Sequence, residues 1–343
     1  MNYRSLARLT EDMRVWSAAL PREIDLVVGV PRSGLLVANL IALFRNLPLG
    51  DLEGLLQGRL LASGPRCSRP LGEEGLADRS LTILVVDDCV STGSAMREVM
   101  RLVEPLREQH TVLLAAAYYD PRAEVALDQA YEPLHMPYVF EWNLMHSWVV
   151  EHGCVDLDGV LCQDPTPEED DDGPAYERFL REAEPYLLPT KTVARIVTAR
   201  LEKYRAPTEA WLQRHGVRFE ELVMMDDPTA AERDAAGRHG AFKAEVYRSE
   251  KRHQLFVESE AEQARQIVRW SGKAVFCVET MQMMTPGALP WHDEQSAPSD
   301  YHRHGTLVGR LRRTLRRASG QVRAHAHNAR RWAQKATARL IGA

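Results

Sequence analysis

The sequence predicts two α/β domains, each built on a parallel sheet, followed by a basic amphipathic helix. Apolar runs alternate with helical patterns in the first part of the chain, and a second alternation of the same kind begins near residue 150. The end of the chain differs from both parts, because from Arg303 onward it contains ten Arg and one Lys but no Asp or Glu. Strands alternating with helices are typical of parallel sheets, and a separate basic segment indicates a third region.

The overall composition is that of a globular protein without a membrane span. Its 343 residues are enough for two domains that each bury a core, and no apolar run is long enough for a membrane-crossing helix. The N-terminus lacks the apolar core of a secretory signal, so we expect a cytoplasmic protein. The five cysteines have neither disulfide nor zinc spacing. Against a net charge of -5, the basic end leaves -16 on the rest of the chain.

The first domain is expected over residues 1–148. Apolar runs bounded by turn residues predict its strands, and the intervening stretches predict helices. The predicted strands are 25–30, 81–86 and 111–117, and the predicted helices are 35–44 and 94–109. This alternation favours a parallel sheet with helices on its faces. We place the domain boundary at 146–152, after an aromatic stretch.

The second domain is expected over residues 149–284. The same reasoning predicts strands at 154–157, 195–198, 221–225 and 255–257, and helices at 207–215 and 230–239. An acidic, proline-bearing segment at 166–173 is predicted to be a surface insertion. Residues 285–343 are expected to form a polar linker and then the basic helical tail.

The segment 83–96, ILVVDDCVSTGSAM, combines a buried strand, two carboxylates and a turn of small residues before a helix. The backbone N–H groups and hydroxyls of such a turn suit a phosphate at the helix N-terminus. Asp87 and Asp88 can accept hydrogen bonds from the hydroxyls of a ribose whose phosphate occupies the turn. An incidental acidic pair beside a capped turn is the competing interpretation. The predicted phosphate-binding residues are Ser91, Thr92, Gly93 and Ser94.

This segment resembles the 5-phosphoribosyl pyrophosphate (PRPP) signature of type I phosphoribosyltransferases. The resemblance implies a Rossmann-like fold and a pyrophosphate-binding loop at the end of DLVVGVPRSG (25–34). In that loop Arg32 can donate a charge-assisted bond, Ser33 lies beside it, and Gly34 permits close backbone approach. The family also has a mobile lid, which we expect over 56–79, although an ordinary surface loop explains the arginines there equally well. These arginines are Arg59, Arg66 and Arg69.

In GCVDLDGVL (153–161) an apolar strand ends in two carboxylates. Asp156 and Asp158 face the same side because they are two residues apart. Paired carboxylates at a strand end suit Mg²⁺ and phosphoryl transfer, whereas simple solvation of the strand end is the competing interpretation. The stretch resembles the first motif of the haloacid dehalogenase (HAD) superfamily. The resemblance implies that Asp156 is a nucleophile and Asp158 a general acid and base.

Later residues follow the order of the remaining HAD motifs. The resemblance implies that Thr198 holds the phosphoryl oxygens and that Lys243 offsets the charge of the phosphorylated aspartate, with Lys251 as a competitor. The family's last acidic motif usually contains aspartates, whereas this chain has Glu258-Ser-Glu260. The short interval between the first two motifs implies that any cap domain over the active site is minimal. The implied Mg²⁺ ligands are Asp156, Asp158, Glu258 and Glu260.

A further acidic pair does not fit this order. Asp226 and Asp227 follow a predicted strand but precede the motif lysine, so we expect them to lie in a loop rather than in a catalytic site.

The order of the two domains resembles the PRPP-dependent ribofuranosyltransferases of bacterial polysaccharide biosynthesis. It implies transfer of 5-phosphoribosyl from PRPP to a hydroxyl of a glycan, which we expect to be lipid-linked, and then hydrolysis of the 5-phosphate. Mg²⁺ is implied at the phosphatase site and with the pyrophosphate of PRPP. Aromatic residues crowd the segment 118–148, where a sugar can stack, although core packing explains them as well. The candidate acceptor-binding residues are Glu141, Trp142 and His146.

The basic tail has apolar residues at every third or fourth position from Leu307 to Leu340. Such a helix suits the anionic inner face of a membrane, where it would hold the protein peripherally. A solvated helix packed on the acidic body and a nucleic-acid patch are the competing interpretations, of which we do not expect the nucleic acid partner. Two other functions stay open, namely a nucleobase phosphoribosyltransferase paired with a nucleotidase, and a non-catalytic regulator that senses PRPP.

Overall fold

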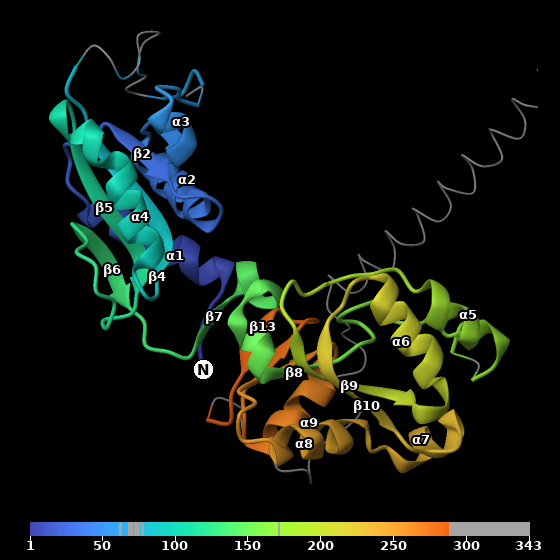
Figure 1. Ribbon diagram of the computed structural model, residues 1–343. Helices are drawn as coiled ribbons and strands as arrows, with labels where there is room; N and C mark the ends of the chain where they lie inside the picture. The colour runs from blue at the N-terminus through green and yellow to red at the C-terminus, as the bar shows by residue number, and fades with distance from the viewer. Residues whose placement is uncertain (62–63, 68–70, 72–75, 77–78, 171, 288–343) are drawn as a thin grey trace, which may run out of the picture. The chain divides into compact units, whose positions relative to one another are not determined.

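The computed structural model describes residues 1–61, 64–67, 71, 76, 79–170 and 172–287. Within these residues the first sheet has five strands, all parallel, in the order β3-β2-β4-β5-β6 (Figure 1). The predicted strands 25–30, 81–86 and 111–117 are confirmed as β2, β4 and β5. The strands of this sheet are β2 (Leu26–Gly29), β3 (Leu49–Asp51), β4 (Thr82–Val90), β5 (Thr111–Tyr119) and β6 (Gln129–Pro133).

Apolar side chains cover both faces of this sheet, which explains its continuous apolar runs. Along β4, Leu84 and Val86 belong to one buried cluster, whereas Ile83 and Val85 belong to another. Helices α1 and α2 contribute to the first cluster, and α3 and α4 to the second. The helices are α1 (Leu6–Ala19), α2 (Ser33–Arg45), α3 (Leu52–Leu56) and α4 (Ser94–Val103).

A small second sheet joins the start of the chain to the segment after β6. Strands β1 (Asn2–Arg4) and β7 (Tyr138–Phe140) pair in parallel. Helix α1 follows at once, and its first backbone N–H groups are capped by Ser5 and by Glu141, whose carboxylate accepts from the N–H of Leu6. The N-terminal residues are therefore held by a segment far away in the sequence.

The third sheet has six described strands in the order β10-β9-β8-β11-β12-β13, and only β13 is antiparallel to its neighbour. The four strands predicted for this part of the chain are all present, as β8, β9, β10 and β11. The strands are β8 (Gly153–Val155), β9 (Val193–Leu201), β10 (Phe219–Met225), β11 (Leu255–Glu258), β12 (Val275–Cys277) and β13 (Gln282–Met284).

Helices pack on both faces of this sheet as well. Buried residues of α5 and α6 join one apolar cluster, and those of α8 and α9 join another. Because β8 lies between β9 and β11, residues at the ends of these three strands are brought together. The helices are α5 (Pro174–Glu182), α6 (Arg205–Arg214), α7 (Ala230–Ala236), α8 (His239–Ser249) and α9 (Ala261–Ser271).

Two predicted helices differ from the observed ones. The helix expected over 94–109 ends at Val103 and continues as a 3-10 helix (Glu104–Glu108), whose second residue, Pro105, has no N–H for an α-helical bond. The helix expected over 230–239 is broken at Gly237, which has φ 57° and separates α7 from α8.

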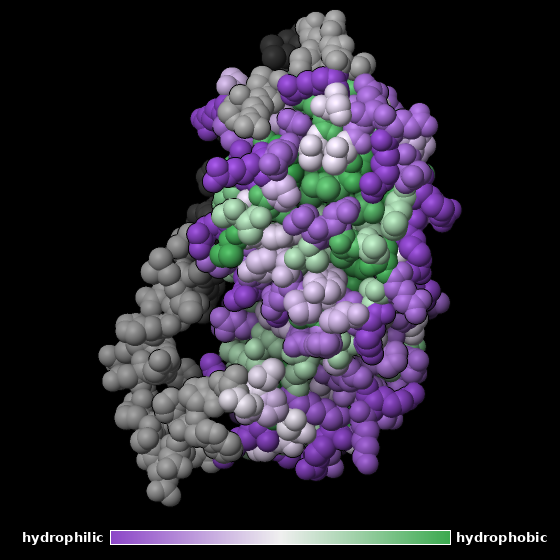
Figure 2. Space-filling view, turned by 90° about the vertical axis from the view of Figure 1, so that its left-hand side faces the viewer, coloured by the Kyte–Doolittle hydropathy of each residue, from purple (hydrophilic) through white to green (hydrophobic). Residues whose placement is uncertain are grey.

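The surface of the described residues includes some apolar side chains, among them Val15, Leu43 and Phe44. Figure 2 shows one face, in whose upper half hydrophobic residues gather and are bordered by hydrophilic ones. No helix among the described residues combines the length and apolarity needed to cross a membrane. The predicted linker and basic tail, apart from 285–287, and the lid residue Arg69 lie outside the described residues.

Candidate active sites

The first candidate site lies where β4 extends beyond its neighbour. Strand β2 ends at Gly29, opposite Val86, whereas β4 continues to Val90 alongside β5. The chain after β2 turns back against β4, because the N–H of Val30 donates to the carbonyl of Val86 over 3.0 Å. The sequence prediction that β4 ends before its carboxylates is therefore corrected, since the ladder with β5 includes Asp87.

The predicted pyrophosphate loop and the predicted ribose carboxylates are in direct contact. A Cβ atom added to Gly34 would lie 2.7 Å from the carbonyl oxygen of Val86 and 3.0 Å from Oδ1 of Asp87. Both distances are shorter than real Cβ atoms normally show, so only glycine fits at this position without a shift. Ser33 also hydrogen-bonds Asp88 through its side chain. The structure thus brings together two segments that the sequence separates by some fifty residues.

The two carboxylates of this site are buried together. Burial, and then the charge of Asp88, raises the pKa of Asp87 to about 8. Burial also raises the pKa of Asp88, although hydrogen bonds from Trp142 and Asp87 oppose the shift. Both carboxyl groups are costly to ionise in this environment. A ligand that supplies hydroxyl donors or positive charge would lower that cost, so the site suits such a ligand.

Trp142 is the predicted acceptor residue that the structure places in this site. Its indole Nε1 donates to Oδ2 of Asp88 over 2.7 Å. The ring stacks on Phe140 with centroids 4.7 Å apart and an interplanar angle of 11°, and Phe140 stacks in turn on Tyr118. An aromatic stack therefore extends from the sheet core to the acidic pair.

The other two predicted acceptor residues, Glu141 and His146, have different surroundings. The carboxylate of Glu141 accepts from the N–H of Leu6 over 2.9 Å and from the hydroxyl of Tyr3 over 3.2 Å. Nδ1 of His146 lies 3.2 Å from Oγ1 of Thr190. The three residues lie in the segment Glu141–His146, whose helical conformation is interrupted at Asn143, and the partners of Glu141 and His146 are not those of Trp142.

The predicted phosphate turn precedes α4, as the sequence indicated. Gly93 has φ 82°, and the hydroxyls of Thr92 and Ser94 lie 3.0 Å apart, both on exposed residues. Arg97 holds the turn from behind by donating to the carbonyls of Thr92 and Glu124. The turn thus presents Ser91, Thr92 and Ser94 to solvent at a helix N-terminus, which is a suitable place for an anion.

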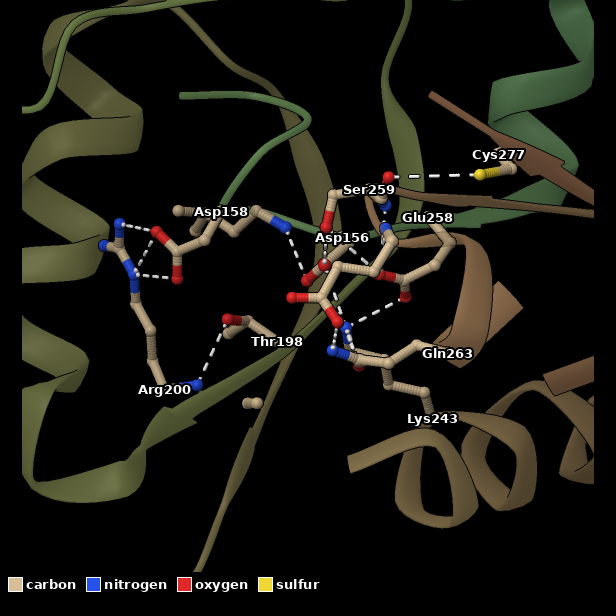
Figure 3. Close-up of polar contacts among 12 residues, drawn as sticks. Asp156, Asp158, Thr198, Arg200, Lys243, Glu258, Ser259, Gln263 and Cys277 are labelled. Carbon is tan, nitrogen blue, oxygen red and sulfur yellow. Dashed lines mark hydrogen bonds and ion pairs between the residues drawn. The ribbon is translucent and has the colours of Figure 1, made fainter. Parts of the chain in front are cut away.

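The second candidate site centres on Lys243, whose ammonium group joins two carboxylates (Figure 3). Nζ lies 2.8 Å from Oδ2 of Asp156, 2.8 Å from Oε2 of Glu258 and 2.9 Å from Oε1 of Gln263. Asp156 is 3% exposed, Lys243 2% and Glu258 0%. Asp156 follows β8, Glu258 ends β11 and Lys243 comes from α8, so three separate elements build the cluster. The competing Lys251 lies on an exposed turn.

This cluster carries more negative than positive charge. Burial lowers the pKa of Lys243, but the charges of Asp156 and Glu258 outweigh burial and leave the pKa raised. Burial also raises the pKa of Asp156 well above its ordinary value, against the opposing charge of Lys243. Two buried carboxylates around one ammonium group are incompletely neutralised, and a further cation would stabilise them.

Asp158 is oriented away from this cluster, toward a residue that the sequence analysis missed. Oδ1 of Asp158 lies 2.6 Å from Nη2 of Arg200, and Oδ2 lies 3.0 Å from Nε (Figure 3). Arg200 lies two residues after Thr198 on β9, where the ladder with β10 shifts register, and its backbone N–H donates to the hydroxyl of Thr198. This spacing and the presence of an arginine in a buried strand are the sequence signals that could have identified it.

The remaining motif residues also lie around Asp156. Thr198 is 1% exposed, and its hydroxyl accepts from the backbone N–H of Arg200 over 3.2 Å. Gly159 has φ 71°, and a Cβ added to it would lie 2.5 Å from the Cβ of Ser259. The glycine that follows Asp158 is therefore required by the close approach of the segment after β11.

The four predicted metal ligands do not form one cluster. Among the described residues there is no group of three or more His, Cys, Asp or Glu side chains that could hold a metal ion. Asp158 is paired with Arg200, and Glu260 is exposed and accepts from Nε2 of Gln263 over 2.9 Å. Asp156 and Glu258 remain as two anionic oxygen donors beside one ammonium group, a donor type that suits Mg²⁺.

The acidic segment predicted as a surface insertion is attached to the body of the protein through Asp172. Asp172 accepts from Nζ of Lys203 over 3.0 Å, from the hydroxyl of Tyr204 over 2.7 Å and from the N–H of Ala230 over 3.2 Å. These partners come from the segments that follow β9 and β10.

The other acidic pair lies in a loop, as predicted. Asp226 and Asp227 follow β10, and Asp227 pairs with Arg238 over 2.8 Å.

Comparison with protein-family models gives no match, and comparison with curated proteins gives none either. Among solved structures, the chain is similar to a purine phosphoribosyltransferase from Pyrococcus horikoshii, with 21% identity over 41% of this chain and 92% of that chain, and a TM-score of 0.31. It is similar to a xanthine-guanine-hypoxanthine phosphoribosyltransferase from Helicobacter pylori, with 15% identity over 41% and 92% of the two chains, and a TM-score of 0.32. A UMP synthase from Leishmania donovani matches at 16% identity over 37% of this chain and 26% of that chain, with a TM-score of 0.28.

Proposed function

We propose that the first site binds PRPP and transfers its 5-phosphoribosyl group. The observation that carries this proposal is the contact of Gly34 with Asp87, which joins a loop suited to pyrophosphate to a carboxylate pair suited to ribose hydroxyls. The turn from Ser91 to Ser94 would hold the 5-phosphate at the N-terminus of α4. Arg32 would donate to the pyrophosphate.

In the proposed transfer the bond between C1 of the ribose and pyrophosphate breaks, and an acceptor oxygen forms a new bond to C1. The acceptor hydroxyl gives its proton to solvent water, and pyrophosphate leaves as an anion with the electron pair of the broken bond. Positive charge develops on the ribose during this step; it would favour the ionised forms of Asp87 and Asp88, whose carboxylates would in turn stabilise it. Mg²⁺ carried on the pyrophosphate of PRPP would offset the charge of the leaving group.

We further propose that the second site hydrolyses a phosphate ester. Asp156 attacks phosphorus, and the ester oxygen leaves with a proton from Asp158. Water then hydrolyses the phosphorylated aspartate, which restores the carboxylate of Asp156. Lys243, which contacts Asp156, would stabilise charge there, and the buried Thr198 would bind phosphoryl oxygens. A Mg²⁺ ion held by Asp156 and Glu258 would supply additional positive charge for the phosphoryl group.

The two proposed reactions form a sequence. Transfer leaves a 5-phosphate on the ribose, and the second site would remove it, so the acceptor gains an unmodified ribofuranosyl group. We propose a glycan hydroxyl as the acceptor, in line with the indole ring of Trp142, whose N–H edge lies against Asp88. The basic tail would hold the protein on an anionic membrane surface, where lipid-linked acceptors reside.

The test is incubation of the protein with PRPP, Mg²⁺ and either glycans or nucleobases, followed by mass spectrometry of the acceptor. We expect a ribosylated glycan, with release of pyrophosphate and phosphate. Asp156→Asn should accumulate a product that retains the 5-phosphate, whereas Asp87→Asn combined with Asp88→Asn should give no product. Asp226→Asn, at an exposed loop position, is the matched control and should behave as the wild type.

Three results would contradict parts of this scheme. Ribosylation of a nucleobase rather than a glycan would identify a salvage enzyme. Binding of PRPP without consumption in the presence of every acceptor would indicate a sensor. Absence of a phosphorylated product with Asp156→Asn would exclude the sequential use of the two sites.

A further inference from the structure

Arg200 is an arginine buried inside the second site rather than at its surface. Its side chain is 0% exposed, whereas its partner Asp158 is 22% exposed. Burial lowers the pKa of the guanidinium, but the charge and hydrogen bonds of Asp158 outweigh burial and leave the pKa raised. A buried arginine is costly unless it is paired, so the pair with Asp158 is a defining feature of the site.

The guanidinium group is fixed from several sides. Nη1 lies 3.4 Å from Oγ1 of Thr208 on α6, and Nη2 donates to the sulfur of Cys162 over 3.4 Å. The guanidinium carbon also lies 5.6 Å from the ring centroid of Phe179 on α5. These contacts come from separate elements and restrain the arginine independently of Asp158. Arg200 is therefore the rigid member of the pair.

The contact with Asp158 involves both carboxylate oxygens. Nε lies 3.0 Å from Oδ2 and 3.2 Å from Oδ1, and Nη2 lies 2.6 Å from Oδ1. A fork of this kind fixes the rotation of the carboxylate as well as its position. Cys162 makes a further contact, with its sulfur 3.4 Å from Oδ1. Asp158 is thus held in one orientation on the Thr198 side of Asp156 (Figure 3).

We propose that Arg200 is a positioning residue, which fixes Asp158 as the base for hydrolysis of the phosphorylated Asp156. This proposal rests on the phosphatase function proposed above. In the hydrolytic step Asp158 takes a proton from water, the water oxygen bonds to phosphorus, and the bond between phosphorus and Asp156 breaks. Inorganic phosphate leaves, and Asp156 regains its carboxylate. A base must be aligned with the water for this step, and Arg200 supplies the alignment.

The two halves of the reaction can be separated with p-nitrophenyl phosphate. Nitrophenolate is stable as an anion, so phosphorylation of Asp156 by this ester needs no proton from Asp158. Hydrolysis of the phosphorylated enzyme still needs a base. A defect in the position of Asp158 should therefore leave a rapid first turnover and slow the steady state.

Stopped-flow measurement of nitrophenolate release by the full-length protein with Mg²⁺ tests the proposal. For Arg200→Met we expect an intact burst and a steady-state kcat reduced by about 10- to 100-fold, with KM unchanged. Arg200→Lys should fall between this variant and the wild type, because an ammonium group keeps the charge but loses the fork. In an Asp158→Asn background, Arg200→Met should cause no further loss, because both changes remove one interaction.

Arg205→Met is the matched control, because Arg205 pairs with Glu202 and Glu209 rather than with Asp158; it should keep the wild-type rate. The proposal would be overturned if Arg200→Met turned over at the wild-type rate, or if it lost the burst while keeping the wild-type melting temperature. It would also be overturned if Arg200→Met lowered kcat further in the Asp158→Asn background. If Arg200→Met does not fold, Arg200→Lys provides the same comparison. If the wild type itself gives neither burst nor turnover, the phosphatase function fails and the positioning role fails with it.

Discussion

Each of the two candidate sites contains a pair of acidic residues, and the two pairs have different surroundings. In the first site Asp87 and Asp88 lie side by side on β4, with Trp142 donating to one of them. In the second, one ammonium group and one guanidinium group hold Asp156 and Asp158 separately. The acidic pairs look alike in the sequence, but one pair shares a common environment and the other is divided between two cations. The chemistry expected of each pair differs accordingly.

The raised pKa of Asp87 makes the stability of the protein depend on pH. The folded state keeps a proton on this group up to about pH 8, whereas the unfolded chain loses it near pH 4, so the folded state binds more protons between these values. This contribution to stability is fully present below about pH 4 and is lost as the pH rises to about 8. We expect the melting temperature of the wild type to fall more steeply over this range than that of Asp87→Asn.

Thermal unfolding of both proteins at a series of pH values measures this effect. Asp226→Asn, which removes an exposed carboxylate of the same type, should follow the wild-type curve. Parallel curves for the wild type and Asp87→Asn would contradict a raised pKa at Asp87.

At the scale of elements, the position of Gly237 determines where Lys243 lies. The left-handed conformation of this glycine ends α7 and allows α8, which carries Lys243, to start at His239 in a new direction. A residue with a side chain is strained in this conformation by about 1 kcal/mol. Gly237→Ala should therefore lower the free energy of unfolding by about that amount in urea titrations.

The matched control for this change is Gly287→Ala, since Gly287 has no left-handed φ and a Cβ there would meet no neighbouring atom. If the two substitutions lowered the free energy of unfolding equally, the left-handed backbone conformation would not be the reason that position 237 requires glycine.

Elements with strong local patterns were predictable from the sequence. The strand that carries Asp87 and the strand that precedes Asp156 consist largely of apolar residues that pack on both faces of a sheet, and this pattern is visible without a structure. Strands β1 and β7 were missed because each has three residues and forms only by pairing with the other across the chain. The partner of Asp158 was missed for a related reason, since Arg200 lies 42 residues away and no local pattern links the two.

At the scale of the whole molecule, the two candidate sites are built on different sheets. The first lies on the sheet from β2 to β6, and the second lies on the sheet from β8 to β13. Among the described residues, the side chains assigned to each site all belong to the part of the chain that contains that site's own sheet. The Asp87 and Asp156 variants are therefore expected to separate transfer from hydrolysis cleanly within one protein.

The charge distribution of the full sequence leads to a prediction about membranes. Ten Arg and one Lys without an opposing carboxylate follow residue 302, and each basic group near an anionic surface contributes up to about 1 kcal/mol. We expect the full-length protein to sediment with vesicles that contain anionic lipid but not with neutral vesicles. The binding should weaken as salt is raised, because the attraction is screened.

A variant in which the arginines at 312, 313, 316 and 317 are replaced by glutamine provides the control, and it should sediment less. Equal sedimentation with neutral and anionic vesicles, or none with either, would instead favour a tail that packs on the acidic body.

The hydrogen bond from Trp142 to Asp88 makes the first site optically observable. An indole whose N–H donates to a buried carboxylate is sensitive to any change in the charge or hydrogen bonding of that group. A sugar hydroxyl that approaches Asp88 would alter this environment directly. The intrinsic fluorescence of the protein thus contains a built-in reporter, and titration with PRPP can follow occupancy of the site before any reaction takes place.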